Sequence, residues 1–600
     1  MEEQLSKYLH VIAAYSPSAM TRKNKFTFLS KKTGIPQAYL WDGNTAKIQP
    51  FGEFNDRVMS VYHSPTGDKT VVGIDHNGNE KQQFYLVSQN GKKKEPLIIS
   101  PEHFHHFGGW STDEHHIVFS SNRRNSGYFD LFVLNMQTRQ EQMVFEYDGN
   151  CVPICWLKDS KKIVIRIQET NIDHSLYILD IETKELVKIG PKDVTARFTS
   201  LVLSEDGQTA FVLSDFENDT LTIYHFSLEQ PEKLYKVIEP CMWDIEELAL
   251  SPDEAFLLYT INEGGTSKLH IFEFSTNKIT HLSNVRSGVI DSLSWLDQSH
   301  FVFALKSPIM PGDIWMYDLR HKEGKRITHD GASPDIEHLW VEPELCTFTS
   351  FDGLKVPYFY YSKEKIPKAA VVYVHGGPEH QIRAEFHPVI QYLVSKGFAV
   401  AAPNVRGSMG YGRKYVQLDD RRKRMDAVAD LANLAEALAT TKQIKPNKIG
   451  IMGRSYGGFM VLASLTHYPT YWAAGIDIVG ISHFKTFLEN TGPWRRRLRE
   501  YEYGFLEEDA DFFEEIAPLN HLEHIKAPLL VFHGRNDTRV PVSEAEQLTN
   551  KMFEMGKEVE LVIFENEGHQ TEKIENHLTM NRKIVAFFNW ISEKNSPTSK

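Results

Sequence analysis

The first half of the chain alternates short apolar runs with tight polar turns, and this alternation repeats at a nearly constant spacing. The turns are anchored at residues 16, 64, 111, 157, 204, 251 and 296, which are 48, 47, 46, 47, 47 and 45 residues apart. After each turn comes a run rich in β-forming residues, and a second such run follows about 10–20 residues later. Seven units of this kind predict a seven-bladed β-propeller of four-stranded blades over residues 14–330.

Beyond this region the pattern changes to strands that alternate with helices. Residues 369–374 and 397–403 are continuous apolar runs, as expected for parallel strands that are buried on both faces. Apolar residues at helical spacing follow, at Met425, Val428, Leu431, Leu434 and Leu438. This alternation predicts a parallel sheet covered by helices over residues 331–600. The propeller is preceded by an N-terminal extension of residues 1–13.

Composition narrows the function classes without changing this division. The chain has 600 residues, 41% of them hydrophobic and 24% charged, with a net charge of −13, which is typical of a soluble globular protein. The acidic excess argues against nucleic acid or a membrane as a partner. The start, Met1-Glu2-Glu3-Gln4, is acidic where a signal peptide would be basic. Four cysteines are too few for a disulfide framework, so we expect a cytoplasmic location.

The sequence predicts no metal site and no cofactor. Cys151 and Cys155 are four residues apart in an apolar stretch, and no matching Cys/His pair follows them. Histidines gather at 103, 105, 106, 115 and 116 without an accompanying pattern of carboxylates. We therefore expect structural or solvent-exposed roles for these side chains.

The segment Gly453-Arg454-Ser455-Tyr456-Gly457 fits the G-x-S-x-G nucleophile elbow. A strand-like run precedes it and a helix-forming run follows it, which is the context that the elbow requires. The turn is so tight that neighbouring Cβ atoms would clash, which explains the glycines. The motif predicts an α/β-hydrolase domain with Ser455 as its nucleophile.

The other members of a catalytic triad are expected downstream, in the order acid and then histidine. Asp537 follows the strand-like run 528–534, and His569 follows the run 559–564. His569 would act as general base toward Ser455, and Asp537 would orient the imidazole.

Two backbone donors are expected to form the oxyanion hole. Tyr456, directly after the nucleophile, would supply one N–H. Gly377, in the loop His375-Gly376-Gly377-Pro378 after an early strand, would supply the other.

These motifs resemble those of the prolyl oligopeptidase family of serine peptidases, and the match spans nearly the whole chain. They are the loop at 375–378 and the segments 404–412, 453–458, 537–541 and 567–569. The likeness is greatest to the acylaminoacyl-peptidase branch, which implies release of N-acylated amino acids from short peptides. It also implies that Arg539 lines the substrate site and that the propeller excludes folded proteins by size.

Other activities of the same fold stay open. Dipeptidyl peptidases of this family carry two glutamates that bind a free N-terminus, and the adjacent pair Glu246-Glu247 is better explained as surface charge. A dipeptidyl or aminopeptidase-type activity is therefore not excluded, and neither is a carboxylesterase. A propeller-based binding protein is disfavoured by the complete triad. The extension 1–13 could pack on the hydrolase domain or reach a neighbouring chain, so a homo-oligomer is possible.

Aromatic side chains after the elbow predict a specificity pocket. Phe484, Phe487 and Trp494 could form an apolar pocket for the side chain before the scissile bond. Two runs nearby, Arg495-Arg496-Arg497 and Arg421-Arg422-Lys423-Arg424, are typical of solvated helix faces.

Overall fold

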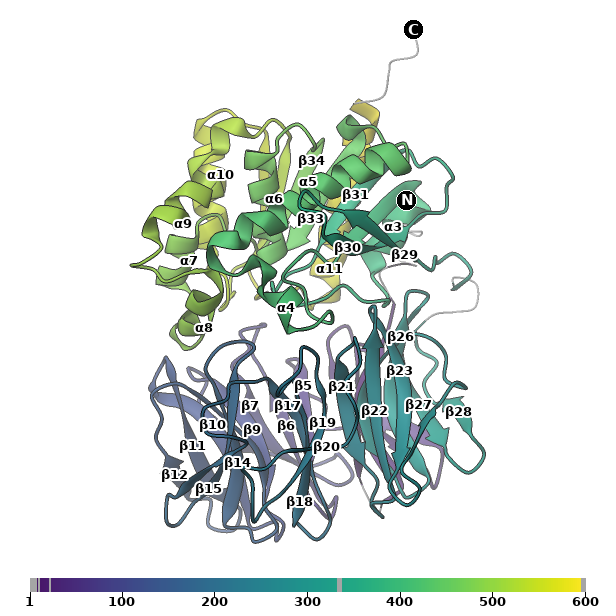
Figure 1. The fold of residues 1–600 in the computed structure, drawn as a ribbon, viewed down its shortest axis with the longest axis vertical. Helices are drawn as coiled ribbons and strands as arrows, with labels where there is room; N and C mark the ends of the chain where they lie inside the picture. The colour runs from purple at the N-terminus through teal and green to yellow at the C-terminus, as the bar shows by residue number, and fades with distance from the viewer. Residues whose placement is uncertain (1–7, 9–10, 21–22, 332–336, 595–600) are drawn as a thin grey trace.

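The computed structural model describes residues 8, 11–20, 23–331 and 337–594. Two domains lie one above the other in Figure 1, a lower ring of strands in purple to teal and an upper domain of helices and strands in green to yellow. The predicted architecture, a seven-bladed β-propeller followed by an α/β-hydrolase domain, is confirmed. No helix in the described ranges is long and apolar enough to cross a membrane.

Each blade is a four-stranded antiparallel sheet made from four consecutive strands. The strands, four to a blade in chain order, are β1 Ala14–Met20, β2 Lys25–Ser30, β3 Gln37–Asp42, β4 Lys47–Pro50, β5 Val58–His63, β6 Lys69–Ile74, β7 Gln83–Ser88, β8 Lys94–Ile98, β9 His105–Trp110, β10 His116–Asn125, β11 Tyr128–Asn135, β12 Glu141–Phe145, β13 Asn150–Trp156, β14 Lys162–Gln168, β15 His174–Asp180, β16 Leu186–Ile189, β17 Phe198–Leu203, β18 Thr209–Ser214, β19 Thr222–Ser227, β20 Tyr235–Lys236, β21 Ile245–Leu250, β22 Phe256–Glu263, β23 Thr266–Glu273, β24 Lys278–His281, β25 Val289–Trp295, β26 His300–Ser307, β27 Met310–Asp318 and β28 Glu323–Arg326.

Tryptophans at the end of three first strands join neighbouring blades. The indole N–H of Trp110 donates to the Tyr62 carbonyl at 3.4 Å, that of Trp156 to Gly109 at 3.2 Å and that of Trp295 to Ala249 at 3.2 Å. Each bond spans 46 to 48 residues, one repeat of the sequence. The same contact therefore recurs between successive blades.

The first of the seven predicted turns was misplaced. Residues 16–18 lie inside β1, where the pairing with β2 shifts between Tyr15 and Ser18. A proline is tolerated at such a bulge because no ladder hydrogen bond needs its missing N–H. In this blade Lys23 and Asn24 lie in a turn before β2, and the Lys23 N–H donates to the Met20 carbonyl at 3.0 Å.

The second domain is built on one eight-stranded sheet in the order β29-β30-β32-β31-β33-β34-β35-β36, parallel from β32 onward. Its strands are β29 Glu344–Thr349, β30 Lys355–Tyr361, β31 Ala369–Val374, β32 Phe398–Pro403, β33 Ile449–Arg454, β34 Ala474–Ile478, β35 Leu529–Gly534 and β36 Val559–Phe564. Its α-helices are α3 Pro388–Ser395, α4 Arg413–Val416, α5 Arg424–Thr441, α6 Tyr456–His467, α7 Phe484–Asn490, α8 Pro493–Tyr503, α9 Ala510–Ile516, α10 Ser543–Glu554 and α11 Ile574–Lys594.

Helices cover both faces of this sheet, as the continuous apolar strands predict. Val372 of β31 packs in one core with residues of α5, α6 and α10. Its neighbour Val371 points to the other face and packs with residues of α3 and α11. The carboxyl ends of the parallel strands thus meet at one edge, where the candidate site residues follow β31, β33, β35 and β36.

The described part of the N-terminal extension packs on the hydrolase domain. The Tyr8 side chain is buried, and its ring centroid lies 5.4 Å from that of Tyr392 in α3. Val11 packs against the same core. The extension therefore contacts the second domain although the propeller separates them in sequence.

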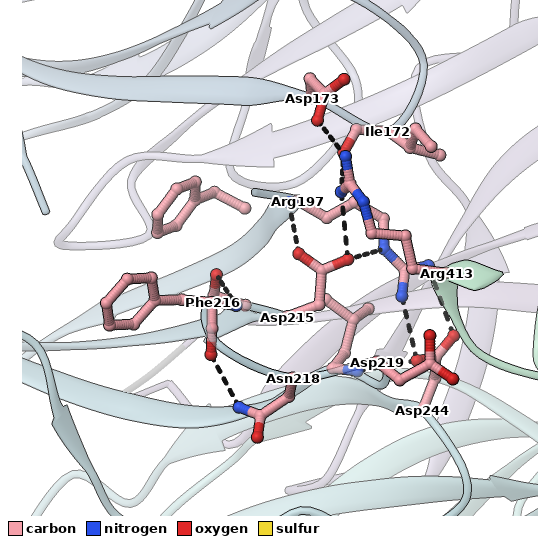
Figure 2. A network of polar contacts seen from close by, with 12 residues as sticks. Ile172, Asp173, Arg197, Asp215, Phe216, Asn218, Asp219, Asp244 and Arg413 are labelled. Atoms are coloured by element: carbon pink, nitrogen blue, oxygen red, sulfur yellow. Dashed lines mark hydrogen bonds and ion pairs between the residues drawn. The ribbon is translucent and has the colours of Figure 1, made fainter. Parts of the chain in front are cut away.

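Arg413 of α4 reaches from the hydrolase domain into the propeller (Figure 2). Its Nη1 donates to the Ile172 carbonyl at 2.9 Å and lies 3.4 Å from an oxygen of Asp215. Its Nη2 forms an ion pair with Asp173. We call this set of residues the Arg413 contact.

The propeller side of the Arg413 contact is a buried chain of charges across two neighbouring blades. Asp215 also accepts a hydrogen bond from Arg197 at 2.9 Å, and Arg197 pairs with Asp244 at 3.1 Å. The three side chains are 5% exposed or less. Because negative and positive side chains alternate, each buried charge is neutralised by its neighbour. Asp215 is thereby held in place as an acceptor for Arg413.

Candidate active site

Ser455 occupies the sharp turn between β33 and α6. Its backbone has φ 59° and ψ −120°, a strained conformation for a residue with a Cβ. A Cβ on Gly453 would come within 2.4 Å of the Gly457 carbonyl oxygen, and one on Gly457 within 2.4 Å of the Val374 carbonyl oxygen. Only glycines fit at these two positions, so the local sequence fixes the elbow and presents Ser455 at its apex.

Asp537 and His569 lie together at the carboxyl ends of β35 and β36. The Nδ1–H of His569 donates to Oδ2 of Asp537 at 2.7 Å. The other carboxylate oxygen accepts the backbone N–H groups of Arg539 at 2.8 Å and Val540 at 3.0 Å. These bonds fix the carboxylate, and the carboxylate fixes the tautomer of the imidazole with Nε2 free to accept a proton.

The elbow and the histidine loop are joined directly. Arg454, which precedes Ser455, donates through Nη1 to the His569 carbonyl at 2.7 Å. The structure thus brings the three predicted triad residues to one edge of the sheet.

Burial shifts the ionisation of the acid and the histidine. For Asp537, burial raises the pKa, but the facing His569 ring and the backbone donors outweigh burial and hold the pKa below 3.8. For His569, burial lowers the pKa below 6.5; Asp537 opposes this shift, and the positive charges of Arg539 and Arg495 add to it. Near neutral pH the pair is therefore a carboxylate beside a neutral imidazole, the state that a general base requires.

The glycine loop after β31 lies against the elbow. A Cβ on Gly376 would be 3.2 Å from the Cβ of Ser455. The next peptide is held by its carbonyl: Gly377 accepts from Nη1 of Arg499 at 3.2 Å and from the hydroxyl of Tyr503 at 3.4 Å. Neither backbone nor side chain of the described residues accepts the Gly377 N–H. Of the two predicted oxyanion donors, Gly377 follows the glycine that contacts Ser455. The other, Tyr456, directly follows Ser455 and opens a helix whose first N–H groups have no intrahelical acceptor.

The side chain of Tyr456 is anchored by a buried arginine. Its hydroxyl lies 3.0 Å from Nη1 of Arg424 and 3.1 Å from Asp419. Arg424 is fully buried and forms ion pairs with Asp419 and Glu502. The prediction that the run 421–424 is a solvated face is wrong for Arg424, because two carboxylates neutralise it, one five residues before it and one 78 residues after it.

Arg539, predicted to line the substrate site, is paired with the propeller. Its Nε and Nη2 each donate to the carboxylate of Glu80 at 2.7 Å. We call this the Arg539 contact. It lies two residues from Asp537, and the same propeller loop also reaches the histidine loop, since a Cβ on Gly78 would be 2.9 Å from the Gly568 nitrogen.

The three aromatic residues of the predicted specificity pocket are placed differently from one another. Phe484 and Phe487 of α7 are each 1% exposed and pack in the domain core around Tyr503. They reach the site only indirectly, through Tyr503, whose hydroxyl donates to the Gly377 carbonyl. Trp494 of α8 instead contacts the propeller, with ring centroids 5.2 Å from Phe104 and 6.4 Å from Phe129.

Several charged residues near the site were missed or misjudged from the sequence. Glu246 is not free surface charge, since it accepts a hydrogen bond from Arg383 of the hydrolase domain at 2.6 Å. Glu80 was not singled out, and no local signal marks it. The prediction that the run 495–497 is a solvated face is wrong for Arg495, whose Nη1 atom is closed off from solvent. Arg499 was not singled out, although its spacing of four residues from Arg495 on a predicted helix could have placed both on one face.

Two family models match the chain. The model of the prolyl oligopeptidase family matches residues 384–595, and the model of its N-terminal β-propeller domain matches residues 52–329. Together they cover both domains.

Similar proteins include peptidases of several specificities. The chain is 33% identical to dipeptidyl aminopeptidase BIII of Pseudoxanthomonas mexicana over 38% of its length, and 26% identical to the acylamino-acid-releasing enzyme of Arabidopsis thaliana over 36%. These matches span 33% and 30% of the relatives' own length. A puromycin-hydrolyzing peptidase of Mycobacterium tuberculosis shares the fold, with a TM-score of 0.86, 17% identity and coverage of 98% of this chain and 95% of that one.

Proposed function

Because the chain belongs to the prolyl oligopeptidase family of serine peptidases, we propose that it is an exopeptidase that releases N-acylated amino acids from short peptides through Ser455, His569 and Asp537. The observation that carries the catalytic part is the hydrogen bond between His569 and Asp537 beside the Ser455 elbow. A fixed carboxylate, a neutral imidazole and a serine at a strained turn are the components of acyl transfer.

The reaction has two stages. Ser455 Oγ attacks the carbonyl carbon before the scissile bond while Nε2 of His569 takes its proton, and the oxyanion receives hydrogen bonds from the N–H groups of Tyr456 and Gly377. The C–N bond then breaks, and His569 gives the proton to the departing amine. Water repeats the sequence on the acyl-enzyme and releases the N-acylated amino acid.

The charge distribution at the domain interface supports a blocked N-terminus. Three glutamates there are already bonded to arginines: Glu80 to Arg539, Glu246 to Arg383 and Glu379 to Arg499. A free α-ammonium that paired with one of these three glutamates would have to displace its arginine, whereas a neutral acylated N-terminus needs no carboxylate partner. The acylamino-acid-releasing relative is consistent with this preference. We also infer a cytoplasmic location, which the four free thiols support.

A fluorophosphonate probe and a substrate panel test this function. The probe should label the wild-type protein and not Ser455→Ala; equal labelling would mean that another residue is the nucleophile. Acetyl-alanyl, free alanyl, glycyl-prolyl and simple ester substrates should then be ranked by kcat/KM. A preference for free-amine dipeptides would replace the proposal with a dipeptidyl peptidase, and a preference for esters alone would replace it with a carboxylesterase.

A further inference from the structure

Helix α8 spans the loops that carry the catalytic groups. Just before it, the Thr491 hydroxyl donates to the Arg539 carbonyl at 2.7 Å. In its last two turns, Arg499 and Tyr503 donate to the Gly377 carbonyl. The helix therefore extends from the loop of the triad acid to the glycine loop beside Ser455, on the side that faces the propeller (Figure 1).

Arg495 lies on the face of α8 that contacts these loops. Residues 495, 499 and 503 are spaced by four, which puts their side chains on one side of a helix. Two of the three touch the Gly377 carbonyl. The charge of Arg495 also acts on His569, where it helps to lower the pKa of the imidazole. Arg495 thus lies between the two catalytic loops.

Among the residues that the structure describes, Arg495 has no counter-ion. Its Nη1 atom is closed off from solvent and makes no hydrogen bond. The neighbouring arginines differ, since Arg499 lies 3.4 Å from Glu379 and Arg539 lies 2.7 Å from Glu80. Burial, with the charges of Arg499 and Arg539, lowers the pKa of Arg495 to about 9, so it remains a cation at neutral pH.

The Arg495 side chain is half-buried and lies 5.7 Å from the Trp494 ring centroid, but its enclosed Nη1 has no acceptor. An enclosed charged donor without an acceptor is costly, and an anionic ligand would remove that cost. We propose that Arg495 binds a carboxylate of the peptide substrate next to the scissile bond, so that the enzyme prefers substrates with an acidic group there. A guanidinium can hold a carboxylate through two parallel hydrogen bonds, which an amide of the same shape cannot replace. The inference rests on the proposed peptidase function, whose substrate class it narrows.

The carboxylate could come from either side of the scissile bond. It is an acidic side chain of the residue that forms the acyl-enzyme, or the C-terminal carboxylate of the leaving part. Two pairs of peptides separate these sources. Acetyl-Glu-Ala-amide against acetyl-Gln-Ala-amide tests the side chain, and acetyl-Ala-Ala against acetyl-Ala-Ala-amide tests the C-terminus.

Binding is measured by calorimetry on Ser455→Ala, which cannot turn the peptides over. In one of the two pairs the acidic peptide should bind about tenfold or more tightly than its amide partner. Adding Arg495→Gln should abolish that preference. Adding Arg497→Gln, on the exposed side of the same helix, should keep it.

Three results would overturn the inference: no acidic preference in either pair, a preference that survives Arg495→Gln, or no binding of any of the four peptides. Circular dichroism checks that the variants fold. If Arg495→Gln does not fold, Arg495→Lys takes its place. This variant keeps the charge but loses the paired hydrogen-bond geometry, so its preference for the acidic peptide should be weaker than that of the wild-type side chain. The proposed function fails separately, through absent fluorophosphonate labelling or absent hydrolysis by the wild-type protein.

Discussion

Two arginines of the hydrolase domain, Arg413 and Arg539, bind carboxylates of the propeller, but in different surroundings. Arg413 meets two aspartates and a carbonyl, and one of those aspartates, Asp215, is itself held by Arg197. Among the described residues the Arg539 side chain pairs only with Glu80, and it is 41% exposed. Three partners, of which Asp215 is fully buried, make the Arg413 contact a structural joint, whereas the Arg539 contact lies two residues from Asp537, beside the site.

The largest expected effect concerns Asp537, which lies two residues from the Arg539 contact. Asp537→Asn should keep the acceptor for the Arg539 N–H but lose the acceptor that fixes the His569 tautomer, so kcat should fall by about 10³–10⁴. Steady-state kinetics on the best substrate of the panel measure it. Asp173→Asn, in the Arg413 contact, is the control and should stay within about twofold of the wild type. Loss of activity in both variants would remove the distinction between the contacts.

The next largest expected effect is on the stability that the Arg413 contact contributes. Arg413→Met leaves Asp173 and Asp215 facing the interface without this cation, and we expect the free energy of unfolding to fall by about 2 kcal/mol. Urea unfolding, followed by tryptophan fluorescence and by circular dichroism, measures the change and shows whether the domains unfold together. An unchanged unfolding curve would mean that the Arg413 contact does not stabilise the fold.

Arg539→Met should give the opposite pattern. If Arg539 binds substrate as the sequence predicts, its loss should lower kcat/KM by about tenfold. Stability should change by less than about 1 kcal/mol for a pair this exposed. Arg535→Met is the matched control, since Arg535 lies in the same loop and pairs with Glu546 and Glu565 away from the site. If Arg539→Met lost as much stability as Arg413→Met and kept full activity, the Arg539 contact would be a structural joint as well, and the distinction between the two contacts would be wrong.

The smallest effect concerns pH. The pKa of His569 is lowered below 6.5, so the acid limb of kcat/KM should lie below pH 6.5, and activity should rise as the imidazole loses its proton. Glu80→Gln leaves the charge of Arg539 unopposed, which disfavours the imidazolium further and should move the limb to lower pH by a few tenths of a unit. Arg413→Met should not move it. A limb that moves upward in Glu80→Gln would contradict the link between this contact and the base.

The parts of the molecule that depend on local sequence could be predicted. The spacing of the blade turns, the apolar strands and the elbow glycines are set by neighbours in the chain, and so is the order of Ser455, Asp537 and His569. The one misplaced turn, at residues 16–18, is a β-bulge. Turns and bulges both contain serine and proline, so the sequence alone did not distinguish them.

The parts that depend on partners far along the chain could not be predicted. Glu80 lies 459 residues before Arg539, and the sequence around neither residue indicates that the two form an ion pair. Arg424 reads as surface charge until Glu502, 78 residues later, folds over it. Phe484 and Phe487 have the composition of a pocket, and only the packing of α7 against Tyr503 shows that they belong to the core.

The contact between Gly78 and Gly568 has a consequence for recombining domains of this family. A Cβ on Gly568 would lie 2.2 Å from the Gly78 carbonyl oxygen, and one on Gly78 would lie 2.9 Å from the Gly568 nitrogen. Neither residue 78 of the propeller nor residue 568 of the hydrolase domain can therefore carry a side chain while the two domains keep this contact. A chimera that grafts a foreign propeller onto this hydrolase domain would need a glycine at the loop tip, or the graft would press directly on the peptide that precedes His569.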